Sequence, residues 1–335
     1  PDMTKHYSAL SLVKEGLRGQ KGWAPAWTSP QPKPRYDIVI IGGGGHGLAT
    51  AYYLARTHGI TDVAVIEKGW LGGGNTGRNT TVVRSNYFFP ESAALYEMAL
   101  KLYEGLSREL DFNIMLSQRG MLSLAHSPAE MELAARTVNA MQINGIDAEL
   151  LSLDRVKSMI PAYDFGPTAR YPVYGGVLQG RGGTARHDAV AWGYARGADR
   201  LGVDLIQNCE VEDFLVEGGR CRGVKTTRGV IRADRVGIAV AGHSSVLAEK
   251  AGFRLPVTSY TLQACITEPV KPILDCVVLA PALGTYVSQS DKGDLVFGGG
   301  LDRVPSYAQR GNLPVLETVI ADEQISRILD KKGLL

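Results

Sequence analysis

A run of glycines lies between an apolar segment and a stretch with helical periodicity near the start of the chain. Residues 36–41, YDIVII, predict a strand, GGGGHG follows at 42–47, and LATAYYLARTHG continues with helix-like spacing. Residues 63–69, VAVIEKG, predict a second strand. Strand, glycine turn, helix and strand in about 30 residues make a βαβ unit, the building block of parallel sheets. We therefore predict an α/β fold.

The glycines fit the pattern G-x-G-x-x-G at Gly42, Gly44 and Gly47, and Glu67 ends the next strand. The first permits a tight turn, the second lets a pyrophosphate approach the backbone, and the third allows close helix packing. The helix N-terminus offers N–H groups to phosphates, and Glu67 would accept hydrogen bonds from a ribose. A glycine turn without a ligand is the alternative, but the position between strand and helix favours a dinucleotide site.

A polar, glycine-rich segment follows the acidic strand end: LGGGNTGRNTTVVRSN, residues 71–86. A simple nicotinamide domain would proceed into its next helix here. This segment instead offers backbone amides and cationic groups along a larger ligand, which favours FAD over NAD. The alternative is a solvated surface loop.

The composition bounds the class of protein. With 335 residues, 44% of them hydrophobic, the chain has enough apolar material for two domains. A net charge of +2 argues against nucleic acid or a membrane surface as the main partner, and the apolar runs are too short to span a bilayer. No CxxC pair or histidine cluster suggests a metal site. We expect a soluble, cytoplasmic protein with reduced cysteines: Cys209, Cys221, Cys265 and Cys276.

The rest of the chain predicts both helices and strands. Helical periodicity occurs at 96–110, 127–144 and 188–201. Loops and strands are expected at 150–180, a hairpin around 217–220, a strand at 236–241, and two strands joined at 291–294.

Five segments resemble the beta subunits of heterotetrameric sarcosine oxidase, which belong to the D-amino-acid-oxidase-like flavoproteins. The similarity covers about residues 36–320, and its segments are YDIVIIGGGGHGLATAYYLA, EKGWLGGGNTGRNTTVVRSNY, GGTARHDAVAW, GHSSVLAEKAGF and YVSQSDKGDLVFGGGLD.

The resemblance implies a fold that is α/β, or α+β as a whole. A Rossmann-like FAD-binding domain of the glutathione-reductase type would have a second, β-sheet-rich substrate domain threaded between its segments. The expected parts are an N-terminal arm and Pro-rich linker (1–35), the FAD-binding domain (36–102 and 182–255), the substrate and interface domain (103–181 and 256–320) and a divergent tail (321–335).

The tail, ADEQISRILDKKGLL, does not match the family and suggests only an amphipathic helix. Family members continue well beyond the region of Val315 with segments that close the flavin site. The expectation is therefore a chain shortened at its C-terminus.

The family's chemistry implies two flavins: noncovalent FAD, and FMN bound covalently to a histidine near the alpha subunit. Sarcosine would reduce FAD, electrons would pass to FMN, and O2 would be reduced to H2O2. The alpha subunit carries NAD and transfers the methylene product to tetrahydrofolate.

Site residues carried over from the family are the following. Arg84 aligns with the arginine that related amine oxidases aim at the substrate carboxylate, a task that suits a bidentate guanidinium. A surface or interdomain salt bridge is the alternative. His46 is expected near backbone and phosphate and not as an acid or base. The FAD contacts fall on Gly42, Gly44, Gly45, His46, Gly47, Glu67, Asn75, Arg78, Thr80, Val82 and Val211.

His187, in GRGGTARHDAVAW, aligns with the histidine that bears FMN. Forming that bond needs a neutral imidazole, because protonation removes the attacking lone pair. Asp188 or a carbonyl would fix the tautomer, and Arg186 would stabilise negative charge on the flavin or its phosphate. Alternatively, Thr184 or Asp188 caps a helix and His187 faces solvent.

Two further functions remain open. Sarcosine and dimethylglycine dehydrogenases attach FAD to a histidine shortly after the acidic strand end, but residues 71–81 contain no histidine. A single-chain FAD-dependent amino-acid or amine dehydrogenase is one alternative to the oxidase subunit. A non-catalytic or truncated nucleotide-binding or subunit-interaction protein is the other.

Overall fold

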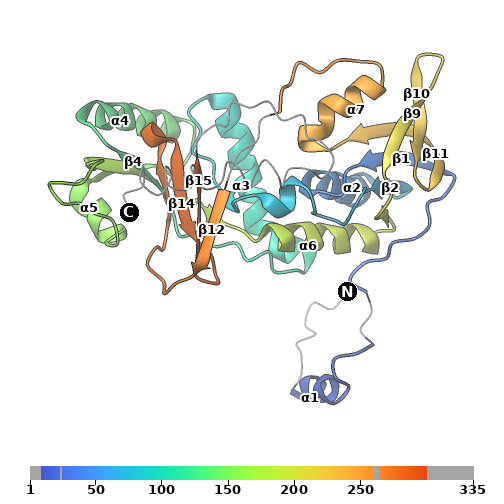
Figure 1. Cartoon of the computed structure of the whole chain (residues 1–335), viewed down its shortest axis with the longest axis horizontal. Coiled ribbons are helices and arrows are strands. Elements are labelled where there is room, and N and C mark those ends of the chain that lie inside the picture. Colours follow the sequence, from blue (N-terminus) through green and yellow to red (C-terminus); the bar gives the residue numbers. More distant parts are fainter. Residues whose placement is uncertain (1–8, 23–24, 260–263, 300–335) are drawn as a thin grey trace. The chain divides into compact units, whose positions relative to one another are not determined.

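The computed structural model describes residues 9–22, 25–259 and 264–299. The expected helix at 321–335 lies outside these residues. The chain forms two compact units, and each is built from three separate stretches (Figure 1). Unit 1 comprises Pro1–Gly77, Ser107–Asn113 and Val190–Val240; unit 2 comprises Arg78–Leu106, Ile114–Ala189 and Ala241–Leu335.

Unit 1 contains a six-stranded sheet with the order β8-β2-β1-β11-β10-β9. The first four strands run parallel, and β11, β10 and β9 form an antiparallel meander at one edge. The predicted βαβ unit is confirmed, with α2 between β1 and β2. The strands are β1 (Arg35–Ile41), β2 (Val63–Ile66), β8 (Asp204–Ile206), β9 (Val211–Glu217), β10 (Arg220–Thr226) and β11 (Gly229–Ile238).

Helix α2 (Gly45–His58) packs on β1 and β2 and ends at Gly59, whose φ of 66° lies in the left-handed region that glycine takes easily. Helix α6 (His187–Arg200) packs closely on α2, because a Cβ on Gly197 would lie 2.8 Å from the Tyr52 ring. Both α6 and α3 (Pro90–Leu110) begin among the residues of unit 2 and end among those of unit 1.

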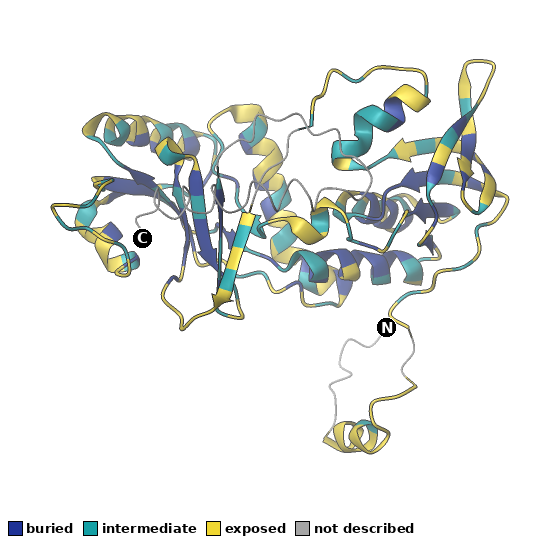
Figure 2. Ribbon diagram, in the orientation of Figure 1, coloured by how far each residue is buried: buried dark blue, intermediate teal, exposed yellow. Residues whose placement is uncertain are grey.

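The N-terminal arm contains α1 (Ala9–Leu17), which has no buried residue (Figure 2). Its apolar side chains are therefore exposed along the whole helix. No helix in the described ranges is long and apolar enough to cross a membrane.

Unit 2 contains a seven-stranded sheet with the order β12-β15-β14-β13-β4-β6-β5, and α4 (Pro128–Ile143) contacts its β4, β5 and β6. A buried apolar cluster, including Leu122, Leu151, Ile160 and Phe297, joins the sheet to the residues around α5. The strands are β4 (Met121–Ala125), β5 (Glu149–Ser152), β6 (Gly175–Gln179), β12 (Ala264–Pro269), β13 (Val277–Ala280), β14 (Thr285–Gln289) and β15 (Asp294–Gly299).

Helix α5 (Leu153–Met159) occupies the region where only loops and strands were expected. That expectation was wrong because seven residues are too few for a helical period to be read. The helix is nevertheless capped, since the Ser152 hydroxyl accepts a hydrogen bond from the Arg155 N–H.

Short elements complete unit 2. The strands β3 (Val82–Val83) and β7 (Gly183–Thr184) form a small antiparallel pair. Helix α7 (Ser244–Lys250) follows the 3-10 turn η2 (Ala241–His243), and η3 (Pro281–Leu283) connects β13 to β14; the 3-10 turn η1 (Asn75–Arg78) lies at the boundary of the two units.

Candidate flavin site

The glycine loop between β1 and α2 has the geometry that its three glycines predict. Gly42 has φ 108°, and a Cβ there would lie 2.3 Å from the Ala239 carbonyl oxygen. A Cβ on Gly47 would lie 1.9 Å from the Gly42 oxygen. Gly44 is extended, with only the Thr76 hydroxyl near its Cβ position, at 3.1 Å. Two glycines are thus required by packing, while Gly44 leaves space for a ligand to approach.

The polar segment after β2 folds back onto this loop within unit 1. The Gly72 N–H donates to the Gly43 carbonyl at 2.9 Å, and the Gly45 N–H donates to the Thr76 hydroxyl at 2.9 Å. The N-cap residue of α2 is Gly44, and it makes no side-chain capping hydrogen bond. The segment is therefore a wall of the glycine loop and not a detached surface loop.

Glu67 hydrogen-bonds the backbone of the loop through its side chain. One carboxylate oxygen accepts from the Gly43 N–H at 2.8 Å and the other from the Gly69 N–H at 2.9 Å. An ionised carboxylate has about four acceptor sites, so both oxygens can still accept from ribose hydroxyls. The Cys209 N–H donates to the Glu67 carbonyl, which brings Val211, buried at the start of β9, to the same end of the sheet.

The other predicted residues of unit 1 are exposed. Asn75 lies in η1, and His46 lies in the first turn of α2 with its carbonyl accepting from the Thr50 hydroxyl. This exposed position fits the expectation that His46 is a neighbour of phosphate and not an acid or base.

In unit 2 the β3–β7 pair joins the two remaining groups of predicted residues. Val82 pairs with Thr184, and the Ala185 N–H donates to the Thr81 carbonyl at 2.9 Å. Thr80 and Val82 therefore lie beside the strand that leads into Arg186 and His187. Arg78 is exposed at the beginning of this segment.

The backbone at Thr81 is held in an uncommon conformation. Its φ is 65°, a left-handed value that is costly for a β-branched residue. The Asn79 side chain accepts from the Thr81 N–H at 2.7 Å and supports the turn. Burial raises the pKa of Tyr286 on β14, and a hydrogen bond with Thr80 acts against that rise, so the Thr80 side chain faces β14.

Arg84 contacts uncharged side chains. Its guanidinium donates to the Asn86 side chain at 2.8 Å and lies over the Tyr87 ring, 4.4 Å from the centroid. Tyr87 in turn stacks on Tyr96 of α3, with 3.9 Å between centroids. Within the described residues no carboxylate pairs with Arg84, so its charge is available to an anionic ligand.

His187 is half-buried at the first position of α6, and its Nδ1 is buried with no hydrogen-bond partner in the described part of the chain. The histidine is thus less exposed than the alternative, in which it faces solvent, predicts. An unpaired buried nitrogen is costly and calls for an explanation, such as a group that the structure does not contain.

Asp188 is engaged by Arg186 and not by His187. Two guanidinium nitrogens donate to its two oxygens at 3.0 and 2.6 Å, and the Ala189 N–H donates to one of them at 2.8 Å. Burial acts to raise the pKa of Asp188, but these hydrogen bonds outweigh it and lower the pKa below its ordinary value. Arg186 also reaches Asp291 at 3.4 Å, so two carboxylates compensate its charge.

Two features of the site were not predicted from the sequence. Thr76 closes the glycine loop, and Ser85, next to Arg84, is completely buried in a polar network with Glu97 and Gln179. The T-G-R order near the glycine run offers a weak signal for the first. No local pattern could have indicated the second, because its partners lie on distant segments.

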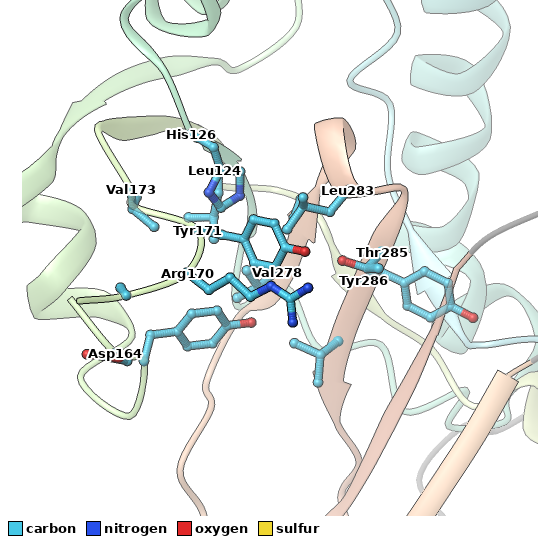
Figure 3. Close-up of a pocket in the computed structure, with 14 residues that line it drawn as sticks. Leu124, His126, Asp164, Arg170, Tyr171, Val173, Val278, Leu283, Thr285 and Tyr286 are labelled. Carbon is cyan, nitrogen blue, oxygen red and sulfur yellow. The ribbon is translucent and has the colours of Figure 1, made fainter. Parts of the chain in front are cut away.

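A separate pocket in unit 2 contains none of the predicted residues (Figure 3). Its walls are mainly apolar and aromatic, and the ring of His126 is anchored by a contact between Nδ1 and the Pro172 carbonyl at 3.1 Å.

The residues present fit a flavin dinucleotide. The open approach at Gly44 and the unoccupied acceptor capacity of Glu67, both in unit 1, are the observations on which this rests. Among the described residues, no group of histidine, cysteine and carboxylate side chains could hold a metal ion.

Comparisons with known proteins agree with this chemistry. The model of the family of FAD dependent oxidoreductases matches residues 37–329. Sarcosine oxidase subunit beta from Rhizobium meliloti (strain 1021) is 58% identical over 313 residues, which are 93% of this chain and 75% of that protein. The subunit of the same name from Arthrobacter sp is 54% identical over 295 residues, 88% of this chain and 73% of that protein. Among solved structures, L-proline dehydrogenase from P. horikoshii has a TM-score of 0.76 and 26% identity, covering 89% of this chain and 79% of that one.

Proposed function

Because this chain belongs to the FAD-dependent oxidoreductases and, among them, to the sarcosine oxidase beta subunits, we propose that it carries the flavins that oxidise sarcosine. The chain is a flavin-dependent oxidoreductase. The proposed reaction is oxidative demethylation of sarcosine to glycine. When bound, FAD would supply the hydride acceptor, and FMN would supply the site at which O2 is reduced to H2O2.

We propose that unit 1 holds the nucleotide end of FAD. Gly42, Gly44 and Gly47 shape the turn, and Gly44 and His46 place backbone N–H groups at the start of α2 for the pyrophosphate. Gly45 lines the same turn, with its N–H donating to the Thr76 hydroxyl. Glu67 accepts from the ribose, and Val211 offers backbone to the adenine side. Asn75 is a further contact in unit 1, and the contacts that the family implies in unit 2 are Arg78, Thr80 and Val82.

Arg84 binds the substrate carboxylate in this proposal. Its guanidinium can donate two parallel hydrogen bonds to a carboxylate, and stacking on Tyr87 restricts its rotation. This contact orients sarcosine and leaves the methyl-bearing nitrogen free for the reaction.

His187 bears the covalent FMN in this proposal. The single observation that carries it is the β3–β7 pair, which places the strand leading to this histidine beside Val82, while the histidine Nδ1 is buried without a partner in the described residues. Arg186 lies next to it, but its guanidinium is already paired with Asp188 and Asp291. The role that the family implies, balancing negative charge on the flavin or its phosphate, therefore requires Arg186 to leave one of these carboxylates.

The partners follow from the same proposal. Sarcosine and O2 are the small-molecule substrates, and an alpha subunit with NAD and tetrahydrofolate sites adjoins the FMN. We propose the cytoplasm as the location, where thiols stay reduced; no disulfide joins the four cysteines.

The test is to denature the purified protein, coexpressed with its partner subunits, in acid and to look for flavin fluorescence in the gel band. His187→Ala should abolish the fluorescent band. His126→Ala is the matched control, because His126 also lies in unit 2 and also has a buried ring nitrogen without a partner.

The control should keep the fluorescence of the parent. Fluorescence that survives His187→Ala would place the bond on another residue. A parent band without fluorescence would favour the non-catalytic, subunit-interaction alternative.

A further inference from the structure

Ser85, the neighbour of Arg84, is held by a buried polar network in unit 2. Its N–H donates to the side-chain amide oxygen (Oε1) of Gln179 at 3.0 Å, and its hydroxyl donates to Glu97 at 2.8 Å. The same hydroxyl accepts from the Gln179 amide at 2.6 Å, and its carbonyl accepts from the Tyr87 N–H at 2.7 Å. Every polar group of Ser85 is thus engaged, and the residue has no exposed surface.

The partners of Ser85 are themselves fixed. Gln179 ends β6, is completely buried and donates to Asp147 at 3.2 Å. Glu97 on α3 is 7% exposed and accepts from the Arg181 guanidinium at 2.5 Å. Arg181 also donates to Glu104 on α3 at 2.8 and 2.9 Å. The hydrogen bonds from Arg181, with the one from Gln118, outweigh burial and lower the pKa of Glu104.

Helix α3 holds the Arg84 segment at two consecutive positions. Glu97 binds the Ser85 hydroxyl, and Tyr96 stacks on Tyr87, on which Arg84 rests. A fully satisfied buried network is rigid, because moving any member leaves polar groups unpaired in a medium of low dielectric. Contacts with α3 therefore hold both Ser85, the neighbour of Arg84 in the chain, and the Tyr87 ring on which its guanidinium lies.

We propose that Gln179 and Glu97 are positioning residues that act through Ser85 to fix Arg84 for binding of the substrate carboxylate. This inference rests on the proposed role of Arg84. It explains why these buried side chains are polar, since apolar side chains of similar volume could pack there equally well.

The test compares two buried glutamines in unit 2. Gln179→Leu removes the partner of Ser85. Gln289→Leu is the matched control, because Gln289 is 4% exposed and hydrogen-bonds the backbone of residues 270–274 and Gly293, with no bond to the Arg84 segment. Both substitutions leave buried polar groups unpaired and should lower the unfolding temperature.

The readout is the dissociation constant of acetate, the carboxylate fragment of sarcosine, measured on the holoenzyme from the change in flavin absorbance. Gln179→Leu should raise it roughly tenfold or more, since displacing a binding group by about 1 Å can cost a hundredfold. The KM for sarcosine should rise by a similar factor, and Gln289→Leu should leave both constants unchanged. If the first variant does not fold, Ser85→Ala, which keeps the backbone bond to Gln179, should show a smaller rise in the same direction.

Arg84→Lys separates the two levels of the proposal. If this variant binds acetate as the parent does, the carboxylate role of Arg84 is wrong, and the positioning role fails with it. If Arg84→Lys weakens acetate but Gln179→Leu and Ser85→Ala do not, only the positioning role is overturned. A rise in Gln289→Leu equal to that in Gln179→Leu would also overturn it, since the effect would then be one of general stability.

Discussion

At the scale of single residues, the glycine loop is set by steric limits that leave little freedom for substitution. The Gly42 oxygen occupies the place where a Cβ on Gly47 would lie, at 1.9 Å. No rotamer change relieves that contact, because the Gly42 oxygen belongs to the backbone and the backbone also fixes the position of a Cβ. The loop therefore depends on Gly47 even before a ligand binds.

Gly47→Ala should destabilise the protein by about 1–3 kcal/mol and weaken FAD retention, because the helix must shift away from the turn. Urea unfolding and the flavin content after gel filtration measure the two effects. Gly105→Ala is the control: it lies in α3 with nothing within 4 Å, and it should stabilise by up to about 1 kcal/mol. Equal stability of Gly47→Ala and the parent would contradict the steric argument.

Asp188 gives a prediction about pH. Its pKa is lower in the folded state than in the unfolded chain, so its carboxylate stabilises the fold above the unfolded pKa of about 3.9. That contribution is lost as the pH falls through the lowered pKa. The difference in unfolding free energy between the parent and Asp188→Asn should therefore shrink on acidification from about pH 6 to about pH 3.

Glu132→Gln is the comparison for this titration. Glu132 faces Arg136 at 4.0 Å on α4, and both side chains are 76% exposed. Exposed pairs contribute little, so this substitution should give a small, nearly constant difference. A difference for Asp188→Asn that stays constant over the same range would show that Arg186 does not stabilise the carboxylate.

At the scale of elements, local signals decided what could be predicted. The two-residue turn between β9 and β10 consists of Gly218 and Gly219, with φ of 58° and 74°, and the sequence indicated this hairpin correctly. The hairpin joined at 291–294 and the main helices were confirmed for the same reason, since their turns and periods are short-range. The family resemblance is confirmed by the relatives of 54 to 58% identity.

Long-range pairing could not be predicted in this way. Nothing in Ile41 or Ile238 indicates that their strands are neighbours, yet they pair in register. The Ser85 network could not be predicted either. Gln179 is far from Ser85 in the sequence, and no local sequence pattern marks a glutamine that will be buried. The spacing of the glycines was enough to predict the glycine loop. The pairing of Asp188 with Arg186 could not be predicted, because it depends on which way each side chain points.

The start of α4 tests the contribution of a local cap. The Ser127 hydroxyl accepts from the Glu130 N–H at 3.2 Å, and the Glu130 carboxylate accepts from the His126 N–H at 2.8 Å. Ser127→Ala should therefore destabilise unit 2 by about 1 kcal/mol. Thr137→Ala, at an exposed position within the same helix, should be neutral or slightly stabilising. Urea unfolding measures both, and equal effects would contradict the cap.

At the scale of the whole molecule, each unit has its own sheet, so ligand effects need not be shared equally. The glycine loop, Glu67 and the wall formed by Gly72 and Thr76 all belong to unit 1. A ligand bound there stabilises the native contacts around it by mass action. The strands of unit 2 belong to another sheet, and a ligand in unit 1 stabilises them only through the stability of the whole protein.

Removal of FAD should accelerate amide hydrogen exchange most in residues 42–47 and 70–77, because the ligand no longer holds the loop closed. Mass spectrometry of the apo and holo forms measures this, and β4 and β6 in unit 2 provide the internal reference. Equal acceleration in both regions would mean that the nucleotide is not held by unit 1.

The order of the six-stranded sheet has a consequence for biosynthesis. β1 carries the glycine loop, but its neighbour β11 is the last strand of that sheet to leave the ribosome. Closing so long a loop between the two strands is slow, and until it closes one edge of β1 has no partner. We therefore expect the dinucleotide to bind late in the maturation of the chain. In a nascent chain that ends before Gly229, β1 lacks its neighbour β11, and the glycine loop is not yet supported on that side.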